Sequence, residues 1–463
     1  MRHRGVVLVA VLVVAVLVAV IAAGLMFRVR AEAGASAATF RGEQAYNASM
    51  SGLARAVAVL RAAALQKAVD PKVWSDQPDL FQNQLVADDG AQQWYFTVYA
   101  DDPSQPAGVV RYGLADEASK VNLNSADQAT LLALPNMTSE LVDCLMDYRD
   151  ADSGTRPDGA EQDYYDRLPQ PYVIANGPLS TLEELFLVKG FNARIIYGED
   201  ANLNGLLDPN ENDGDDSFPP DDRDGHLDRG LRGVATVWST EPNTDSEGRQ
   251  RIDLAAAAPT DLGLPDQTVE FIRLYLGEGG KFKDPSDLLE MRYQLKQDAK
   301  EPSDLKARAW IESGVGAVEL PVVMDRLTTR PPASPVVGLV NVNTAPAEVL
   351  AAMPGMDAGL AQRIVEARRD LDAETRATIA WLYTQNLVDA AAFKAIAPYL
   401  TTRSLQFTVR CVGFGVPCGR YRVIEAVVDF SGAAPRIAYL RDISRLGLPF
   451  ALDVNSMQRS QSQ

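Results

Sequence analysis

MRHRGVVLVAVLVVAVLVAVIAAGLMF, residues 1–27, decides how the fold begins. Val6 to Phe27 include no charged or strongly polar side chain, and roughly 22 residues at about 1.5 Å each reach about 33 Å, enough to cross a bilayer core. The run is longer than the apolar region of a cleavable secretory signal. Residues 31–70 then continue without proline and place Phe40, Leu53 and Leu60 at roughly helical spacing. The pattern predicts one helix over residues 6–70, running from a membrane into solution.

A short basic start, a glycine and an apolar run together resemble the leader of type IV prepilins. The resemblance implies that a prepilin peptidase cuts between Gly5 and Val6, so residues 1–5 would be a leader. Most such pilins carry Glu as the fifth mature residue, where this chain has Ala10. A carboxylate inside a bilayer is kept only if it finds a partner, so its absence suits a subunit with nothing above it. The alternative for the same segment is an ordinary signal anchor.

The composition is acidic, with 44 Lys and Arg against 62 Asp and Glu and a formal net charge of −18. Such a field repels phosphate backbones, so no nucleic-acid partner is expected. Three cysteines occur. Cys411 and Cys418 bracket a hairpin-like stretch and are the candidates for a local disulfide outside the cytoplasm. Their separation permits the bond without requiring it.

An internal repeat organises the middle of the chain. VNLNSA at residues 121–126 recurs as VNVNTA at residues 340–345, an offset of 340 − 121 = 219, and Arg149 matches Arg368 at the same offset. Each copy predicts an extended piece, a helix capped by Ser125 or Thr344, a turn and a second helix. A weaker third copy begins near residue 251. The pattern resembles a helix-hairpin-helix, but few basic residues accompany it, which favours a packing unit over a DNA-binding one.

DANLNGLLDPNE, residues 200–211, fits the 12-residue calcium loop of an EF-hand position by position. Gly205 supplies the sharp turn at the sixth position. The expected oxygen ligands are Asp200, Asn202, Asn204, the Leu206 carbonyl, Asp208 and Glu211. Hard oxygen ligands at this density favour Ca²⁺ as the cofactor.

A second acidic stretch, DRDGHLD at residues 222–228, has the core of another such loop. Asp222, Asp224 and Asp228 are its expected ligands, and the first position lacks an acid, which Asp213, Asp215 or Asp216 could supply by folding back. Between Glu199 and Asp228 the sequence holds eleven carboxylates and one Arg. Without neutralisation these carboxylates would repel one another. Gly198 and the prolines at 219 and 220 favour a fixed structural site over a sensor that opens.

Alternation of aromatic and β-branched residues predicts strands at residues 93–100, 108–114, 405–414, 420–430 and 436–440. Gly413, Gly415 and Gly432 are read as turn positions. The fold class is α+β: a type IV pilin-like long N-terminal helix plus a small antiparallel sheet, with a large, mostly helical inserted domain of SAM- or helix-hairpin-helix-like repeats. The predicted boundaries are leader 1–5, helix 6–70, first sheet part 71–119, insert 120–335 with the calcium loop at 199–230, second repeat unit 336–403, C-terminal strands 404–445 and tail 446–463.

The order of these features resembles one family, the K-type minor pseudopilins of the type II (general) secretion system. The resemblance rests on Gly5, Ala10, the stretch DEASKVNLN at 116–124, the acidic loop and the closing NVNTAP unit at 341–346. It implies a structural subunit at the tip of the periplasmic pseudopilus, anchored by a single pass in the bacterial inner membrane. Such a subunit nucleates pseudopilus assembly and aids protein export through the outer membrane. The implied partners are the I- and J-type minor pseudopilins, the major pseudopilin, the inner-membrane platform, the secretin and the prepilin peptidase.

Enzyme signatures are weak in this sequence. His3 and His226 are its only histidines, neither lies in a nucleophile pattern, and no phosphate-binding glycine loop occurs, so no catalytic activity is expected. Two other functions remain open at this point. One is a minor pilin of a type IV pilus, and the other is a membrane-anchored competence-type DNA receptor with helix-hairpin-helix units.

Overall fold

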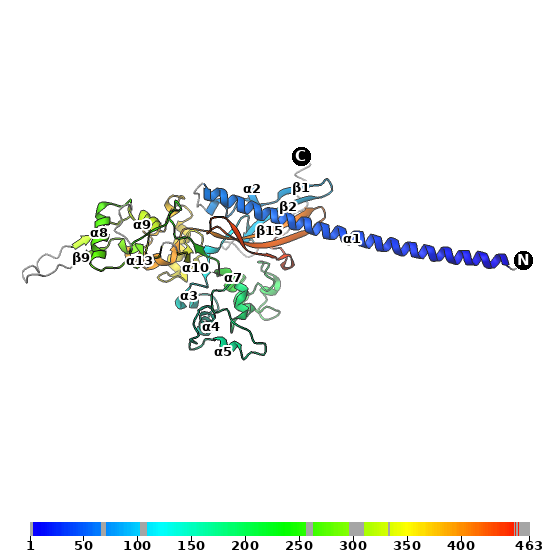
Figure 1. Ribbon diagram of the computed structural model, residues 1–463, viewed down its shortest axis with the longest axis horizontal. Helices are drawn as coiled ribbons and strands as arrows, with labels where there is room; N and C mark the ends of the chain where they lie inside the picture. The colour runs from blue at the N-terminus through cyan, green and yellow to red at the C-terminus, as the bar shows by residue number, and fades with distance from the viewer. Residues whose placement is uncertain are drawn as a thin grey trace, which may run out of the picture.

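The computed structural model describes residues 3–65, 71–101, 109–255, 263–295, 310–331, 334–448, 450 and 452. Its α-helices are α1 (His3–Leu65), α2 (Pro78–Phe81), α3 (Gln128–Leu132), α4 (Ser139–Arg149), α5 (Gln162–Tyr165), α6 (Ala193–Tyr197), α7 (Gly230–Val234), α8 (Asp266–Gly277), α9 (Leu320–Arg326), α10 (Ala347–Ala351), α11 (Ala358–Ala367), α12 (Trp381–Thr384) and α13 (Ala390–Ile396). Figure 1 shows the order along the long axis: the free end of α1, a sheet packed on the rest of that helix, and a body of short helices.

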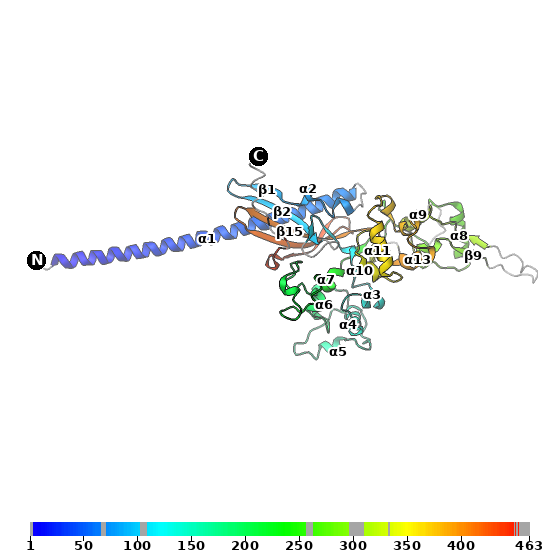
Figure 2. The same cartoon turned by 180° about the vertical axis from the view of Figure 1, so that it is seen from behind.

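The N-terminal half of α1 stands clear of the rest of the molecule (Figures 1 and 2). Residues 7–37 are all exposed, and the first buried residue of α1 is Ala45. From there α1 packs on the sheet, with Leu53, Ala56 and Leu60 in a shared core. The predicted long helix is therefore confirmed as far as Leu65, and residues 66–70 lie outside the described residues. No other described segment covers its apolar part.

The sheet is antiparallel and has the strand order β1-β2-β15-β16-β17, with β3 beside β2 and β4 beside β15. Its strands are β1 (Gln84–Asp88), β2 (Gln93–Asp101), β3 (Val110–Arg111), β4 (Ala115–Asp116), β15 (Gln406–Val416), β16 (Tyr421–Asp429) and β17 (Arg436–Asp442). β2 pairs with β15, so strands from before and after the insert are neighbours. The insert thus leaves the sheet at Asp116 and returns at the residue opposite it, Phe407. These features confirm the pilin-like α+β fold.

Two glycines that were read as turns lie instead inside β15. A side chain at Gly413 would collide with the backbone of Ala45 and Ser49 in α1, and one at Gly415 would collide with Trp94 on β2. The prediction of turns at these glycines is wrong because the missing side chains serve close packing. Gly432 does lie in the connection between β16 and β17.

The predicted strand over residues 108–114 is also broken. Only Val110 and Arg111 belong to β3, and Gly113 packs against the backbone of Trp74 and Ser75, where a Cβ atom would not fit. The amide of Leu114 then donates to the carbonyl of Trp74 at 3.0 Å. Contact with the segment after α1 therefore replaces regular pairing here.

The insert is built from three units, each closed by a short parallel strand pair. The pairs are β5 (Val121–Asn122) with β6 (Ala235–Thr236), β8 (Ile252–Asp253) with β11 (Leu327–Thr328), and β13 (Val340–Asn341) with β14 (Leu400–Thr401). The remaining short strands are β7 (Thr240–Glu241) with β12 (Val336–Val337), and β9 (Arg292–Gln294) with β10 (Trp310–Glu312). The helices between them share one large apolar core, separate from the core under α1. Both strong copies and the weaker third copy of the sequence repeat thus correspond to structural units.

The first and last units share an internal frame. The Arg149 guanidinium donates to the carbonyls of Leu123 and Ala126, and the Arg368 guanidinium donates to Val342 and Ala345 at 2.8 and 2.7 Å. Each arginine closes the Asn-x-Asn corner onto the second helix of its unit. These basic side chains therefore hold the units together.

The predicted helix caps are displaced by two residues. α3 is capped by Asp127, whose side chain accepts from the Thr130 amide, and α10 starts after Pro346 without a side-chain cap. The prediction of Ser125 and Thr344 as caps is wrong because the Asn-x-Asn corner extends farther than the pattern suggested.

Candidate metal centre and assembly surfaces

Residues 200–211 fold into a compact loop that follows the EF-hand pattern. Asp200 Oδ2 accepts from the Gly205 amide at 3.1 Å, which ties the first position to the sixth. Leu203 and Gly205 have φ angles of +59° and +73°, so the chain reverses where the motif needs a glycine. The loop also accepts from outside itself, because Arg229 donates to the Gly205 carbonyl at 3.4 Å. The sequence pattern and the backbone therefore agree.

The polar side chains of this loop converge on its centre. The Asn202 and Asn204 amides donate to Asp208 Oδ2 at 2.7 and 2.9 Å. Glu211 accepts from the Ala201 amide at 3.2 Å and from the Asp208 amide at 3.1 Å. The third-position Asn202 accepts from the Asn204 amide at 2.9 Å, and Asn204 in turn accepts from the Leu206 amide at 2.6 Å. All six residues expected as ligands thus lie in one folded loop.

Burial makes this loop suited to a cation. Asp200 is 5% exposed and Glu211 is 1% exposed. Within the described part of the chain, Asp200 Oδ1 is buried and has no hydrogen-bond partner. Burial raises the pKa of both carboxyls, and for Glu211 the nearby Asp200 and Asp208 raise it further. An unpaired buried carboxylate is costly, and a bound hard cation removes that cost, so the donor set fits Ca²⁺.

The second acidic stretch shows the same hydrogen bonds, but its ends come from elsewhere in the chain. Asp222 accepts from the Asp224 amide at 3.1 Å, and Asp224 accepts from the His226 amide at 2.6 Å. The Gly225 amide donates to Asn212 Oδ1 at 3.1 Å, as Gly205 does to Asp200. The Asp228 amide donates to Glu199 Oε2 at 3.2 Å, as Asp208 does to Glu211. Asn212 and Glu199 therefore occupy the places of the first and last residues of a calcium loop.

This arrangement replaces the expectation that Asp213, Asp215 or Asp216 would complete the second loop. The Asp213 carboxylate accepts from the Ser217 hydroxyl at 2.6 Å, and the Asp216 carboxylate accepts from Arg223 at 2.6 Å. Sequence reasoning missed Asn212 and Glu199 because neither belongs to the contiguous run at 222–228. The only feature of the sequence that pointed to Asn212 and Glu199 is that each lies directly beside the first loop.

The cysteine pair does not form the expected disulfide. All three cysteines are free. Cys411 lies inside β15, which continues to Val416, and Cys418 lies beyond the end of that strand. Five extended residues at about 3.3 Å each separate Cys411 from Val416 alone, whereas a disulfide needs Cα atoms within about 7 Å. The candidate pair Cys411 and Cys418 is therefore unbonded, because Cys411 lies within β15 and Cys418 lies in the turn between β15 and β16.

The leader residues Gly5 and Val6 lie in the first turns of α1. Among the described residues, α1 is a helix long and apolar enough at its N-terminal end to cross a membrane. The apolar side chains there are well exposed, with Phe27 at 72%. This helix provides a candidate anchor and a candidate surface for helix association.

An ion network joins the acidic loops to the sheet. Arg410 on β15 contacts Asp101 on β2 at 2.9 Å and Glu425 on β16 at 2.8 Å. From the insert, Arg229 contacts Asp101 at 3.2 Å and Arg232 contacts Glu425 at 3.1 Å. Burial raises the pKa of Glu425, but Arg410 and Arg232 outweigh burial and hold that pKa far below its usual value. The segment that follows the second loop is thus fixed to the sheet by paired charges.

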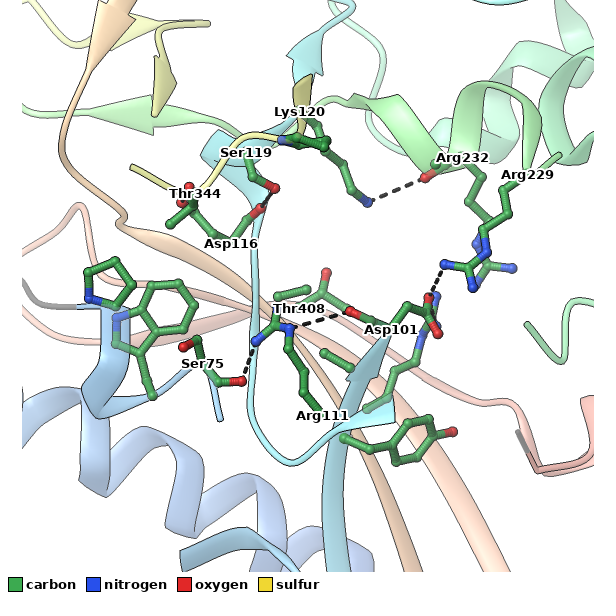
Figure 3. Close-up of a pocket in the computed structure, with 18 of the residues that line it drawn as sticks. Ser75, Asp101, Arg111, Asp116, Ser119, Lys120, Arg229, Arg232, Thr344 and Thr408 are labelled. Atoms are coloured by element: carbon green, nitrogen blue, oxygen red, sulfur yellow. Dashed lines mark hydrogen bonds and ion pairs between the residues drawn. The ribbon is translucent and has the colours of Figure 1, made fainter. Parts of the chain in front are cut away.

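Beside this network lies a cavity of about 290 Å³ between sheet and insert. Figure 3 shows Arg229 beside Asp101 on one side and Asp116 near Thr344 on the other. Asp116 is buried, and its Oδ2 accepts from Asn341 at 3.1 Å, Thr344 at 2.5 Å and Ser404 at 2.6 Å. Burial raises the pKa of Asp116 to about 6 despite these hydrogen bonds. Asp116 therefore joins the sheet to the last repeat unit.

Two segments of the chain match family models. Residues 114–197 and residues 340–403 each match a model described as type II secretion system (T2SS), protein K. The first segment begins shortly before the first strong copy of the repeat at residue 121, and the second begins with the other strong copy at residue 340. Two separate regions of the chain thus match the type II secretion system protein K family.

Other comparisons add less. No match was found among curated proteins. Among solved structures, the chain is similar to a chain of "The Crystal Structure of the GspK-GspI-GspJ complex from enterotoxigenic Escherichia coli Type 2 Secretion System", with 14% identity, 88% of this chain and 98% of that chain covered, and a TM-score of 0.36. The two protein K matches support a minor pseudopilin, a structural component of the secretion apparatus.

Proposed function

We propose that this minor pseudopilin occupies the tip of the periplasmic pseudopilus, nucleates its assembly and aids protein export through the outer membrane. The observation that carries the proposal is the position of the insert. It leaves and re-enters the sheet at neighbouring strands, and α8, α9 and α13 lie beyond the end of α1 that is far from the N-terminus, while α4, α5 and α7 lie to one side of that end (Figure 1). A subunit that is widest at that end hinders the addition of another subunit above it.

The N-terminal half of α1 would serve two purposes. Residues 7–27 anchor the chain in the bacterial inner membrane by a single pass, with the bulk of the chain in the periplasm. Prepilin peptidase removes residues 1–5 by cutting between Gly5 and Val6. The exposed apolar helix then packs against the corresponding helices of the I- and J-type minor pseudopilins and the major pseudopilin, because helices in lipid associate through close side-chain packing. The inner-membrane platform and the secretin are the remaining partners.

The acidic loops would bind two calcium ions. The first ion is held by Asp200, Asn202, Asn204, the Leu206 carbonyl, Asp208 and Glu211. The second is held by Asp222, Asp224 and Asp228 with Asn212 and Glu199. Two bound calcium ions would offset four of the eleven negative charges of the 199–228 segment and keep the segment rigid against the ion network on the sheet.

Photo-crosslinking in a strain with the other pseudopilins tests the tip assignment. A photoreactive phenylalanine analogue replaces Phe40, which is 60% exposed on α1 just beyond the apolar run. The matched control places it at Phe218, which is 74% exposed on the insert. The Phe40 position is expected to crosslink to I- or J-type subunits and the Phe218 position is not. Crosslinks from Phe218 to further copies of the major pseudopilin would place subunits above the insert and refute a tip position.

A further inference from the structure

A third carboxylate cluster lies outside the two loops already described. Asp150, Asp152 and Glu161 flank the connection between α4 and α5, and one oxygen of each carboxylate lies within 4.8 Å of the others. This connection belongs to the first repeat unit. Acidic clusters are common on protein surfaces, so the cluster alone would carry no argument.

Burial distinguishes this cluster from an ordinary acidic surface. Glu161 is 5% exposed, and in the described residues neither of its carboxylate oxygens has a hydrogen-bond partner. Asp150 Oδ1 is likewise buried without a partner. Buried polar atoms in proteins are nearly always satisfied, so oxygens of two residues left unpaired in one place indicate a missing positive group.

The spacing of these residues repeats that of the first calcium loop. Asp150 and Glu161 are the first and last residues of a 12-residue stretch, DADSGTRPDGAE, as Asp200 and Glu211 are of theirs. The third residue, Asp152, accepts from the Gly154 amide at 2.7 Å, as Asn202 does from the Asn204 amide at 2.9 Å. The stretch has Thr155 where the motif has glycine, which explains why the pattern is not evident in the sequence.

We propose that Asp150, Asp152 and Glu161 bind a further divalent cation, calcium by their all-oxygen chemistry. The ion would join the C-terminal end of α4 to the start of α5. Ala160 and Tyr165, on either side of that start, belong to the core of the insert. The site would therefore fix the connection between the two helices of the first unit to its core.

One basic side chain lies close enough to compete with a cation. Arg156 Nη2 is 3.4 Å from Asp150 Oδ2, and Arg156 Nε is 3.4 Å from Asp147 Oδ1. These contacts leave Asp150 Oδ1 unpaired, and in the described part of the chain the ion pairs of Arg156 are with Asp147 and Asp150. Residues 143–163 hold seven carboxylates and two arginines, so one guanidinium does not balance the charge. Burial raises the pKa of Glu161, and Asp147, Asp150 and Asp152 raise it further.

A further oxygen lies next to the cluster. The Asn176 side-chain amide donates to the Asp152 carbonyl at 3.4 Å, and its Oδ1 is buried without a partner in the described residues. Calcium takes six to eight oxygen ligands, and neutral amide oxygens commonly supply some of them. Asn176 therefore adjoins the backbone of Asp152 and has a buried amide oxygen that no described residue pairs.

Counting bound calcium in the full-length, detergent-extracted protein tests the proposal. Equilibrium dialysis with elemental analysis gives the number of ions per chain for wild type, E161Q, D152N and E211Q. E161Q is expected to bind one ion fewer than wild type, and D152N, at an exposed position, is expected to weaken one site at least tenfold. D163N is the matched control, because Asp163 is exposed and outside the cluster. Equal counts and affinities for wild type, E161Q and D152N would overturn the proposal.

Thermal unfolding separates a ligand role from a structural one. In chelator, E161Q is expected to melt at or above the wild-type temperature, because the variant removes an unpaired buried charge. In calcium it is expected to melt below wild type. If E161Q lowers the melting temperature equally in chelator and in calcium, Glu161 has a structural role in packing and is not a calcium ligand. The two proposed calcium sites can be tested separately. If E161Q loses an ion and E211Q does not, the proposal for Asp150, Asp152 and Glu161 stands, and the proposal of calcium in the 200–211 loop is refuted.

Discussion

The first and last repeat units have one frame and different contents. In both, a parallel strand pair closes the unit, an arginine binds the carbonyls of the Asn-x-Asn corner, and a left-handed residue separates the two helices. The chain from Arg149 to Ala235 on β6 covers 235 − 149 = 86 residues, whereas the chain from Arg368 to Leu400 on β14 covers 400 − 368 = 32. All three candidate cation sites lie in the longer connection.

This difference separates folding from ligand binding. The frame has an apolar core and is held by hydrogen bonds within its own unit. It recurs in both units, although the connection from the arginine to the closing strand is long in the first unit and short in the last. The longer connection contributes carboxylates that the frame does not need. The units also attach differently: the last one through Asp116 and Asn341, and the first through Arg229, Arg232 and the charges on the sheet. The comparison teaches that added loops can acquire cations without altering the unit that supports them.

The two frame arginines are expected to give the largest effects. Arg149→Ala and Arg368→Ala each leave two carbonyls without their charged donor, and each is expected to lower the free energy of unfolding by about 3–5 kcal/mol. The measurement is chemical unfolding of the full-length protein in detergent, with Arg363→Ala as an exposed control. Similar losses at both arginines support a common frame. A loss at Arg368 without one at Arg149 would show that the long connection, and not the arginine, holds the first unit.

Asp116 is expected to make the attachment of the last unit sensitive to pH. Its folded pKa of about 6 lies above the usual 3.8. Its stabilising contribution is therefore fully present below about pH 4 and is lost as the pH rises through 6. Two pKa units correspond to about 3 kcal/mol. The difference in unfolding free energy between wild type and Asp116→Asn should fall by about that amount from pH 4 to pH 7.

Taking this difference at each pH removes any constant effect of the substitution, including the altered contact with the Ala118 amide. Asp163→Asn, at an exposed position, serves as the control. A difference that does not change across this range would mean that the buried carboxyl is ionised at no net cost, and that Asn341, Thr344 and Ser404 fully compensate its burial.

Calcium should separate the two units in a hydrogen-exchange experiment. At calcium concentrations 100 times the dissociation constant, the ion adds about 2.7 kcal/mol to the folded state of whatever it binds. Amides in residues 199–228 are expected to exchange roughly 10- to 100-fold more slowly with calcium than with chelator, and amides in residues 358–400 should not change. Glu211→Gln should reduce the protection of residues 200–211. Equal protection in both units would contradict a local role for the ion.

The sequence predicted what is periodic or contiguous. The long apolar helix, the strand alternation, the duplicated Asn-x-Asn corners and the 200–211 motif each follow from a local pattern, and each corresponds to an element of the structure. Gly413 could not be interpreted correctly from the sequence, because its role depends on where Ala45 and Ser49 of α1 lie in space. The candidate disulfide between Cys411 and Cys418 is absent for a related reason. The spacing of the two cysteines does not show that β15 continues as far as Val416 before the chain turns.

The candidate sites show the same limit. Residues inside one run, such as Asp222 and Asp224, were found, whereas Glu199 and Asn212 meet them only after folding. The 150–161 stretch escaped notice because it lacks the motif's glycine. What identifies it is the burial of Glu161, and no sequence pattern encodes burial at the start of a short helix. Linear motifs thus identified the first loop completely, the second in part and the 150–161 stretch not at all.

The smallest expected effects concern the residue between the two helices of each unit. Asn136 and Gly355 occupy equivalent positions, 355 − 136 = 219, with φ angles of +59° and +81°. Gly355→Asn should cost about 1 kcal/mol, because the backbone is left-handed and a Cβ would lie 3.1 Å from Ile396 Cγ2. Asn136→Gly should change the free energy of unfolding by no more than about 0.5 kcal/mol, because glycine adopts this backbone freely. Urea midpoints of the full-length protein measure both.

Asn136 has one feature that Gly355 lacks: its side-chain amide lies 3.3 Å from Asp228 Oδ2 in the second acidic loop. If Asn136→Gly costs as much as Gly355→Asn, that contact outweighs the relief of backbone strain. Repeating the measurement in chelator then separates the causes. A cost that is present only with calcium would mean that Asn136 positions Asp228 for the ion, and a cost that is the same in both conditions would make the contact a plain hydrogen bond. The two equivalent positions would then differ for the same reason as the units themselves, because only the first faces an acidic loop.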